Sequence, residues 1–307
     1  METRALRYFQ AVAELASYSR AAEFLRISQP AISRQISRLE AELGQALFTR
    51  HGHGVSLTDA GKILLERGQT ILRQLDQAQA ELRRGTQGPS GTVTLAVPPA
   101  AGHFLVPELA RRFADAFPNV FLRIVGGYSA FIHDWLGRGQ VDLACVHDPL
   151  PQRGFATVPL IREPVFLVGR AGALPAGKGH LRMQDLGGVA LILPSRPNAS
   201  RRLLDEWMSR RGIALDVRME VDDPTLIRAL LRAGIGCSLL TLGSFQAELR
   251  LGELQSLPFR PATHWQLTLI QATNGQPSPV VAALAAMIRQ TAHDLHARGD
   301  WPGLLAG

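Results

Sequence analysis

The sequence has few cysteines, few lysines and no long apolar run. Two cysteines in 307 residues exclude the disulfide-rich scaffold of small secreted domains. Cys145 and Cys237 each lie in an apolar, strand-like segment, so we expect buried free thiols rather than a disulfide. No stretch reaches the ~18 apolar residues of a membrane span. The start METRALRYFQAVAELAS places charges before any apolar run, unlike a signal peptide, so we expect a cytoplasmic chain without a membrane partner.

Nearly all of the positive charge is arginine. Lys62 and Lys178 are the only lysines, and the formal net charge is +7. This charge is spread along the chain, so it permits nucleic-acid binding without indicating it. The 46% hydrophobic and 19% charged content is that of a globular protein. At ~100–200 residues per domain, the length allows two or three domains.

The pattern of residues 1–58 predicts a winged helix-turn-helix domain. Apolar residues recur at helical spacing in the stretch SRAAEFLRISQPAISRQISRLE and in the segment before it. A helix is expected to start with Ser28 as N-cap and Pro30 in its first turn, and to stop at Gly44. The following LFTRHGHGVSLT predicts a two-stranded ribbon with a glycine-rich tip, which is a wing.

A long linker helix is expected over residues 59–87, capped by Thr58. Apolar residues recur along it with heptad spacing, at Leu64, Ile71, Leu75, Ala78 and Leu82. Such a repeat on an exposed helix favours pairing with a second chain. The alternative is a helix that lies on its own domain. The composition of GTQGPSG, residues 85–91, is typical of a flexible linker.

Beyond residue 91, strand-like and helix-like segments alternate, which predicts an α/β effector domain over residues 91–307 with parallel sheets. Two halves are expected. Lobe I comprises residues 91–160 and 265–307, and lobe II comprises residues 161–264. Extended crossings between the lobes would leave a cleft.

The outward face of the third helix is rich in groups that read DNA. Glutamine can bind adenine through two hydrogen bonds, arginine can bind guanine or phosphate, and serine serves either. For an isolated helix a solvated face is the simpler interpretation, but the whole helix-turn-helix and wing pattern favours DNA. The residues expected to contact DNA are Ser19, Arg20, Gln29, Pro30, Ser33, Arg34, Ser37, Arg38, Arg50, His51, His53 and Thr58.

The stretch SYSRAAEFLRISQPAISRQISRLEAELGQALFTRHGHGVSLTDAG resembles the DNA-binding module of LysR-type transcriptional regulators, and ELARRFADAFPNV, GQVDLACV and LRAGIGCSLL extend the resemblance. It implies a dimerising linker helix and a two-lobed domain similar to periplasmic solute-binding proteins. It also implies base contacts from Gln29, Pro30 and Ser33, with Arg34 nearby. The family commonly places a basic wing residue in the minor groove, where this chain has histidines, so that contact is expected to be weaker or pH-sensitive.

The same resemblance implies the partners. These are double-stranded promoter DNA carrying an interrupted inverted repeat, a small-molecule effector, RNA polymerase, and further copies of the chain in a dimer or tetramer. The resemblance also implies that the regulator is an activator or a dual regulator.

The effector is expected beyond the carboxyl ends of strands, where helix N-termini offer free N–H groups. Such N-termini together with Arg, Ser and Asn favour a small carboxylate, and an aliphatic one because Tyr128 is nearly the only aromatic candidate. The alternative is that Ser195 and Asn198 cap a helix and the arginines face water. The candidates are Pro99, Ala100, His103, Tyr128, Ser129, His147, Ser195, Arg196, Asn198, Arg201 and Thr241.

Two other classes of function would suit parts of the sequence. Residues 91–300 alone would suit a solute-binding or transport-associated protein, and an enzyme with a regulatory DNA-binding domain would need a catalytic constellation that the sequence does not display. GALPAGKG lacks the final Ser or Thr of a phosphate-binding loop. His293 and His296 lack a third metal ligand in reach. We therefore expect no cofactor, no metal and no enzymatic activity.

Overall fold

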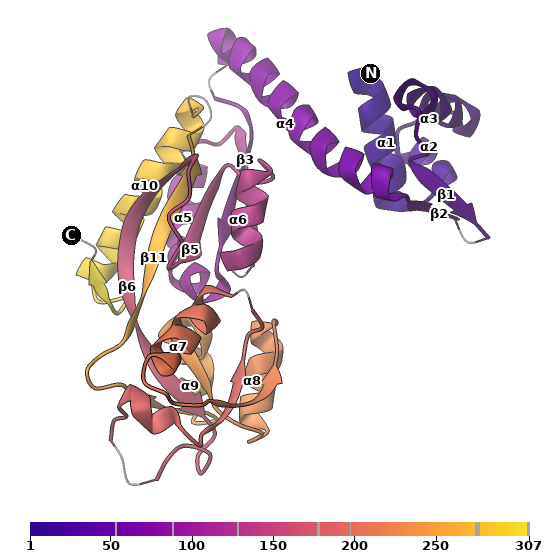
Figure 1. Ribbon diagram of the computed structural model, residues 1–307. Coiled ribbons are helices and arrows are strands. Elements are labelled where there is room, and N and C mark those ends of the chain that lie inside the picture. The colour runs from indigo at the N-terminus through magenta and orange to yellow at the C-terminus, as the bar shows by residue number, and fades with distance from the viewer. Residues whose placement is uncertain are drawn as a thin grey trace. The chain divides into compact units, whose positions relative to one another are not determined.

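The computed structural model describes residues 1–52, 54–87, 89–127, 129–176, 179–196, 198–273 and 277–305. Two compact units are present, Met1–Gly91 with Arg138–Gln140, and Thr92–Gly137 with Val141–Gly307 (Figure 1). Among the expected site residues, His53 and Tyr128 lie outside the described residues.

The N-terminal unit is a winged helix-turn-helix followed by one long helix, as predicted. Its elements are α1 (Thr3–Leu15), α2 (Tyr18–Phe24), α3 (Gln29–Leu43), β1 (Phe48–His51), β2 (Gly54–Leu57) and α4 (Asp59–Gln87). Strands β1 and β2 pair antiparallel and form the wing. The small core gathers apolar residues from every element before α4, including Phe9, Ile32, Ile36, Leu39 and Phe48.

Local chemistry explains where these helices begin and end. Ser17 accepts a hydrogen bond from the backbone N–H of Arg20 at 3.3 Å and caps α2. Ser28 is the N-cap of α3, although its side chain makes no capping hydrogen bond, and Pro30 lies in the first turn. Gly44 ends α3 with a φ of 65°, a left-handed conformation that glycine adopts without a steric penalty.

Helix α4 has the expected bounds, Asp59–Gln87. It includes the first three residues, 85–87, of the stretch whose composition is typical of a linker. Gly85 weakens a helix without stopping it, and the first proline after the start of α4 is Pro89. Gly68 is buried, and a Cβ there would lie 3.3 Å from Leu6, so glycine allows α1 to approach. In the expected heptad seam Ile71 is 43% exposed and Leu75 is half-buried, while the side chains of Ala78 and Leu82 lie outside the described part.

In the effector unit, the central sheet of lobe I has the strand order β4-β3-β5-β11-β6. Strands β3 and β5 are parallel, whereas β11 is antiparallel to both β5 and β6. The expected parallel pairing holds for β3 and β5 but not for β11, because β6 carries the chain out of lobe I and β11 brings it back. The elements are β3 (Gly91–Val97), α5 (Pro99–Ala116), β4 (Val120–Gly126), α6 (Ser129–Gly137), β5 (Leu143–His147), β6 (Phe155–Gly169), β11 (His264–Ala272), α10 (Pro279–Ala297) and β12 (Leu304–Leu305).

Lobe II is built on the far end of the same long strand. Strands β9 and β10 pair antiparallel with β6, and β7 pairs parallel with β8. Figure 1 shows β6 and β11 running together from the part that carries α10 to the part that carries α7. The elements are the 3-10 turn η1 (Met183–Leu186), β7 (Ala190–Leu193), α7 (Ala199–Ser209), β8 (Asp216–Glu220), α8 (Pro224–Arg232), β9 (Ser238–Thr241), the 3-10 turn η2 (Leu242–Ser244), α9 (Gln246–Arg250) and β10 (Gln255–Pro258).

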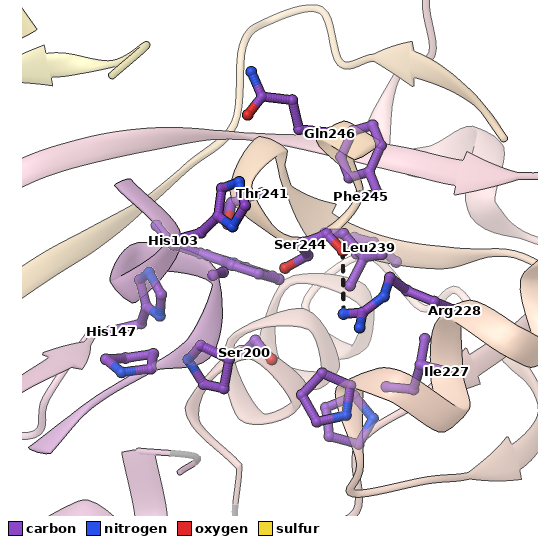
Figure 2. A pocket seen from close by; sticks show the side chains of 18 of the residues that line it. His103, His147, Ser200, Ile227, Arg228, Leu239, Thr241, Ser244, Phe245 and Gln246 are labelled. Carbon is purple, nitrogen blue, oxygen red and sulfur yellow. Dashed lines mark hydrogen bonds between the residues drawn. The ribbon is translucent and has the colours of Figure 1, made fainter. Parts of the chain in front are cut away.

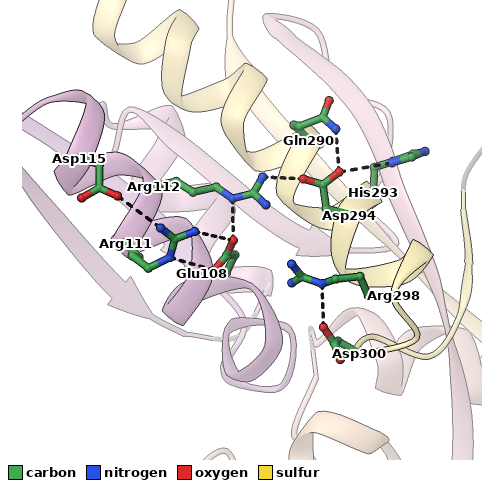
Figure 3. A network of polar contacts seen from close by, with 9 residues as sticks. All are labelled: Glu108, Arg111, Arg112, Asp115, Gln290, His293, Asp294, Arg298 and Asp300. Atoms are coloured by element: carbon green, nitrogen blue, oxygen red, sulfur yellow. Dashed lines mark hydrogen bonds and ion pairs between the residues drawn. The ribbon is translucent and has the colours of Figure 1, made fainter.

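A polar network ties α5 to α10 on the surface of lobe I (Figure 3). Arg112 donates to Asp294 of α10 at 2.7 Å and to Glu108 of its own helix at 2.8 Å. Hydrogen bonds from Arg111 and Arg112 lower the pKa of Glu108 to about 2. The hydrogen bond from Arg112 likewise lowers the pKa of Asp294. Both carboxylates are thus held in their charged form.

Both cysteines are buried and free, as predicted. Burial raises the pKa of Cys145 to about 12 and that of Cys237 to about 11. Neither thiol therefore supplies a thiolate nucleophile at neutral pH. Over the described residues, no helix combines the length and the apolar character needed to cross a bilayer.

A candidate DNA-binding surface and a candidate effector pocket

The outward face of α3 is a polar surface. Ile32, Ile36 and Leu39 turn inward and are buried, which leaves the opposite side of the helix to solvent. Ser33 is half-exposed, and the exposed residues of this face are Gln29, Pro30, Arg34, Ser37 and Arg38. Among the described residues, Arg34 and Arg38 form no ion pair. Their guanidinium groups are available to an anionic partner such as a phosphate.

The other candidates around α3 are of mixed character. Ser19 and Arg20 are exposed on α2, and His51 is exposed at the end of β1. The side chain of Arg50 lies outside the described part of the chain. Thr58 is occupied as the cap of α4, since its hydroxyl accepts from Gly61 N–H at 3.0 Å and donates to the carbonyl of Ala46 at 2.7 Å. A Cβ at Gly61 would collide with the carbonyl of Leu47, so glycine permits this close junction.

The effector unit holds a pocket of about 330 Å³ between its two lobes. Several of its residues stand at the carboxyl ends of strands: Pro98 follows β3, His147 ends β5, Pro194 follows β7 and Thr241 ends β9. Six of the expected effector-binding residues line it together, namely Pro99, Ala100, His103, His147, Asn198 and Thr241.

Lobe II closes over one side of this pocket through η2. Gly243 in η2 lies so near the first turn of α5 that a Cβ would collide with the carbonyl of Ala100. A side chain at this position would push the lobes apart, so glycine is needed for the observed approach. Ala100 itself lines the pocket, and the first-turn N–H groups of a helix lack intrahelical acceptors and carry partial positive charge.

Three expected contacts lie outside the pocket lining and are engaged elsewhere. The hydroxyl and backbone N–H of Ser195 donate to Asp222 at 2.6 and 2.9 Å. Arg196 donates to Asp205 at 2.7 Å. Arg201 is 7% exposed and donates to Asp205 and, at 2.7 Å, to Glu220.

Asn198 lines the pocket and also caps α7, since its Oδ1 accepts from the N–H of Ser200 at 3.0 Å. Ser129 begins α6, but its side chain is outside the described part of the chain.

The pocket also contains residues that the sequence did not indicate. Arg228 of α8 pairs with Glu248 of α9 at 3.0 Å, and both line the pocket. The segment PTLIRALLRAG, which contains Arg228, has a helical pattern, but α9 was not predicted, so nothing in the sequence indicated the pair. The apolar lining includes Ile227, Leu239, Phe245 and Trp265. Two aromatic rings therefore line a pocket that was expected to have few.

Polar side chains lie at both ends of the pocket. Figure 2 shows His103, His147 and Thr241 on one side of the view and Ile227 and Arg228 on the other. Thr241 is 1% exposed, and no hydrogen-bond partner for its hydroxyl exists among the described residues. An unsatisfied buried hydroxyl costs ~1–3 kcal/mol, a cost that a bound polar group can remove. Groups of three or more potential metal ligands are absent from the described residues.

Two family models match the chain. The bacterial regulatory helix-turn-helix protein, lysR family, matches residues 3–62, and the LysR substrate binding domain matches residues 86–293. The chain belongs to the LysR family of transcriptional regulators. The expectation drawn from the motifs of α2, α3 and the wing is thereby confirmed, together with the architecture of a helix-turn-helix domain followed by an α/β effector-binding domain.

Two curated relatives match most of the length of this LysR-type regulator. It is 30% identical over 305 residues to the HTH-type transcriptional regulator BbuR of Bordetella bronchiseptica, and the aligned region covers 99% of this chain and 94% of BbuR. It is 34% identical over 242 residues to the nitrogen assimilation regulatory protein nac of Escherichia coli, with 78% of each chain covered.

Among solved structures, full-length CbnR in complex with its target DNA superposes with a TM-score of 0.72 at 25% identity and covers 95% of this chain and 100% of that one. This LysR-type regulator thus joins a DNA-binding domain to an effector-binding domain.

Proposed function

We propose that this regulator binds an interrupted inverted repeat at a promoter through α3 and changes its action on the promoter when a small carboxylate occupies the pocket between the lobes. The observation that carries the proposal is the pocket itself. It lies where β3, β5, β7 and β9 end, and its walls come from both lobes. Ligands of open α/β sheets bind at the carboxyl ends of strands. A ligand that touches both lobes also changes their equilibrium spacing, which is a route to regulation.

The end of the pocket that holds His103 and the first turn of α5 suits one anionic group. The His103 ring and the first-turn N–H groups supply N–H donors or partial positive charge there. The charge of Arg228 is already matched by Glu248, so a second carboxylate would have no free cation in the described lining. The rest of the lining mixes apolar and polar side chains, and its apolar part includes Phe245 and Trp265. We therefore propose a monocarboxylate with an apolar or aromatic body, in place of the small aliphatic acid that the sequence suggested.

DNA recognition is assigned to the exposed face of α3. Gln29 and Ser33 would contact base edges, and Arg34 would contact phosphate or guanine. The CbnR structure with target DNA, which matches this chain in fold and at 25% identity, supports the use of the same unit. Two copies of α3 would read the two halves of the repeat.

Assembly is assigned to α4. Ile71 is 43% exposed and Leu75 is half-buried on a helix of 29 residues, so one chain alone leaves this seam partly in water. We expect Leu75→Asp to convert a dimer or tetramer into smaller species, because the buried charge would have no partner in the seam. Light scattering measures the mass. An unchanged mass would place the interface elsewhere.

The regulator is proposed to act in the cytoplasm by binding, together with RNA polymerase, and without catalysis. Its two thiols have pKa values raised by burial to about 12 and about 11, and in the described residues no metal-ligand cluster is present. A solute-binding role in transport is not favoured, because it would leave the N-terminal helix-turn-helix unit without a function.

A gel-shift experiment with the DNA upstream of the protein's own gene tests the proposal. Full-length protein is titrated alone and with benzoate, phenylacetate, propionate, succinate or the neutral control benzamide. We expect binding at low salt, and a change in affinity or mobility with an aryl monocarboxylate but not with benzamide. No DNA binding under any condition would refute the regulator on this promoter. DNA binding that ignores every carboxylate would refute the effector class alone.

A further inference from the structure

A buried carboxylate lies directly behind the pocket wall. Glu163 is on β6, opposite Trp265 of β11, and is only 2% exposed. Its Oε2 lies 2.6 Å from Nε2 of His147, and its Oε1 accepts a hydrogen bond from the indole N–H of Trp301 at 3.0 Å. His147 and Trp265 line the pocket, but Glu163 does not. The carboxylate therefore does not touch an effector in the pocket and contacts it only through its neighbours.

The chemistry of the three groups sets the direction of these bonds. An indole N–H is a donor only, so Oε1 must act as an acceptor. An imidazole nitrogen is intrinsically more basic than a carboxylate oxygen, so the proton shared between Nε2 of His147 and Oε2 of Glu163 belongs to the nitrogen. Glu163 thus accepts from both sides, and Nε2 of His147 carries a proton. A carboxylate held against one ring nitrogen fixes both the tautomer and the orientation of an imidazole.

The far end of the chain fixes the carboxylate in turn. Trp301 is fully buried and stacks on Phe104 of α5 at a ring-centroid distance of 5.6 Å. Just beyond it, β12 pairs with β6 at residues 161 and 162. A Cβ at Gly303 would lie 2.7 Å from the carbonyl of Arg162, so glycine permits this close pairing. The segment after α10 is therefore held where its indole reaches Glu163.

We propose that Glu163 is a positioning residue of the effector pocket, which holds the His147 ring and its Nε2 proton in place, and that Trp301 completes this support. The inference rests on the proposed function of the pocket as the effector site. Its effect is to put an oriented imidazole, rather than a carboxylate charge, in the wall that an anionic ligand meets. If Glu163 served only to accept the hydrogen bond from Trp301, replacing it would leave the tautomer of His147 unchanged.

Nitrogen NMR of the histidines tests the proposal without any effector. The full chain is labelled with ¹⁵N-histidine, and long-range ¹H–¹⁵N spectra are assigned with a His147→Gln variant. We expect a protonated Nε2 in the wild type. In Glu163→Gln the amide oxygen can still accept from Trp301 while its NH₂ group donates to Nε2, so the ring should change to the Nδ1–H tautomer. His103 should keep its signals, and the control Glu108→Gln should leave His147 unchanged.

Two further measurements keep the proposal open to refutation if Glu163→Gln folds poorly. An unprotonated Nε2 in the wild type overturns it directly. Trp301→Phe keeps the ring stack but removes the N–H donor, and it should speed the exchange of the His147 Nε2 proton with water several-fold. No change in exchange would remove Trp301 from the arrangement.

Calorimetry with benzoate as the probe links the state of His147 to binding. We expect Glu163→Gln to strengthen benzoate binding about tenfold, because the change removes a buried negative charge and moves the ring proton to Nδ1, while Glu108→Gln has no effect. Equal affinity in Glu163→Gln would overturn the positioning role even if the tautomer changes. A wild type that binds no benzoate would instead refute the ligand class proposed above, with the histidine spectra still deciding the role of Glu163.

Discussion

Helices α3 and α7 are both rich in Ser and Arg, but the arginines of α3 are unpaired among the described residues and those near α7 are bonded to acidic side chains. On α3, Arg34 and Arg38 are exposed and have no ion-pair partner among the described residues. Near α7, Arg196 and Arg201 both bond to Asp205. The sequences differ in the position of the acids. Asp205 follows Arg201 by four residues, one turn along the same face, whereas the residue four after Arg34 is another arginine.

Arg38 shows that spacing alone is not sufficient. Glu42 follows it by four residues, but Glu42 is bonded to the N-terminal amine of Met1. An arginine cluster therefore indicates an anionic ligand only when nearby acids are missing or already engaged. By this criterion we expect the exposed face of α3 to bind an anionic partner, whereas the start of α7 carries a structural ion-pair network.

The largest expected effect is on the stability of the effector unit. Arg201→Met leaves Asp205 and Glu220 without the guanidinium that joins α7 to β8, and the arginine is 7% exposed. Breaking a buried pair from one side costs about 3 kcal/mol in the free energy of unfolding. Urea unfolding measures it.

Arg196→Ala is the matched control, because Arg196 has the same acceptor but a side chain that is 70% exposed. It should cost below about 0.5 kcal/mol. Equal losses in the two variants would contradict the view that burial separates these two arginines.

An effect of intermediate size is expected for DNA binding. Gln29→Ala should weaken binding to the cognate site by about 2 kcal/mol, the loss of one base contact, and should barely affect random DNA. Fluorescence anisotropy with the two DNAs measures both affinities.

Gln10→Ala is the control for this change, since Gln10 of α1 bonds to Glu14 at 2.8 Å and is not on the α3 face. Equal loss on cognate and random DNA would mean that Gln29 contacts only the backbone. A loss in Gln10→Ala of the same size would mean that domain stability is being measured instead.

The fold was largely predictable because its signals are local. The periodic burial of Ile32, Ile36 and Leu39, the N-cap Ser28 and the stop at Gly44 all lie within one turn of the feature they determine. The sheet direction was not predictable in this way. Whether β11 pairs parallel or antiparallel depends on where β6 has carried the chain, which is a property of distant segments.

The pocket was predictable only in part, for the same reason. Strand ends placed His147 and Thr241 at the pocket, since a strand's carboxyl end can be read from sequence. Glu163 and Trp301 were missed because they are 138 positions apart and meet only through the folding of the C-terminal segment onto β6. Arg201 was placed among the ligand contacts because its link to Glu220 of β8 joins two separate elements.

The smallest expected effect concerns pH and the network between α5 and α10, where arginines are paired as near α7 but at the surface. Glu108 has its pKa lowered from 4.5 to about 2 by hydrogen bonds from Arg111 and Arg112. A carboxyl group whose pKa is lowered by folding contributes stability above its unfolded pKa, and that contribution is lost as the pH falls toward the folded pKa. The network should therefore support α5 against α10 fully at neutral pH and lose this effect between about pH 4.5 and about pH 2.

Thermal melting across this range should show a steeper fall for the wild type than for Glu108→Gln, whose side chain does not ionise. Asp294→Asn should reduce the slope in the same sense, because the pKa of Asp294 is lowered by the same arginine. The difference should be small and should shrink further in 0.5 M salt, since these groups are solvent-exposed and screened. Parallel curves for the wild type and both variants would show that surface pairing contributes nothing measurable here, and that burial, as at Arg201, is what makes an arginine pair matter.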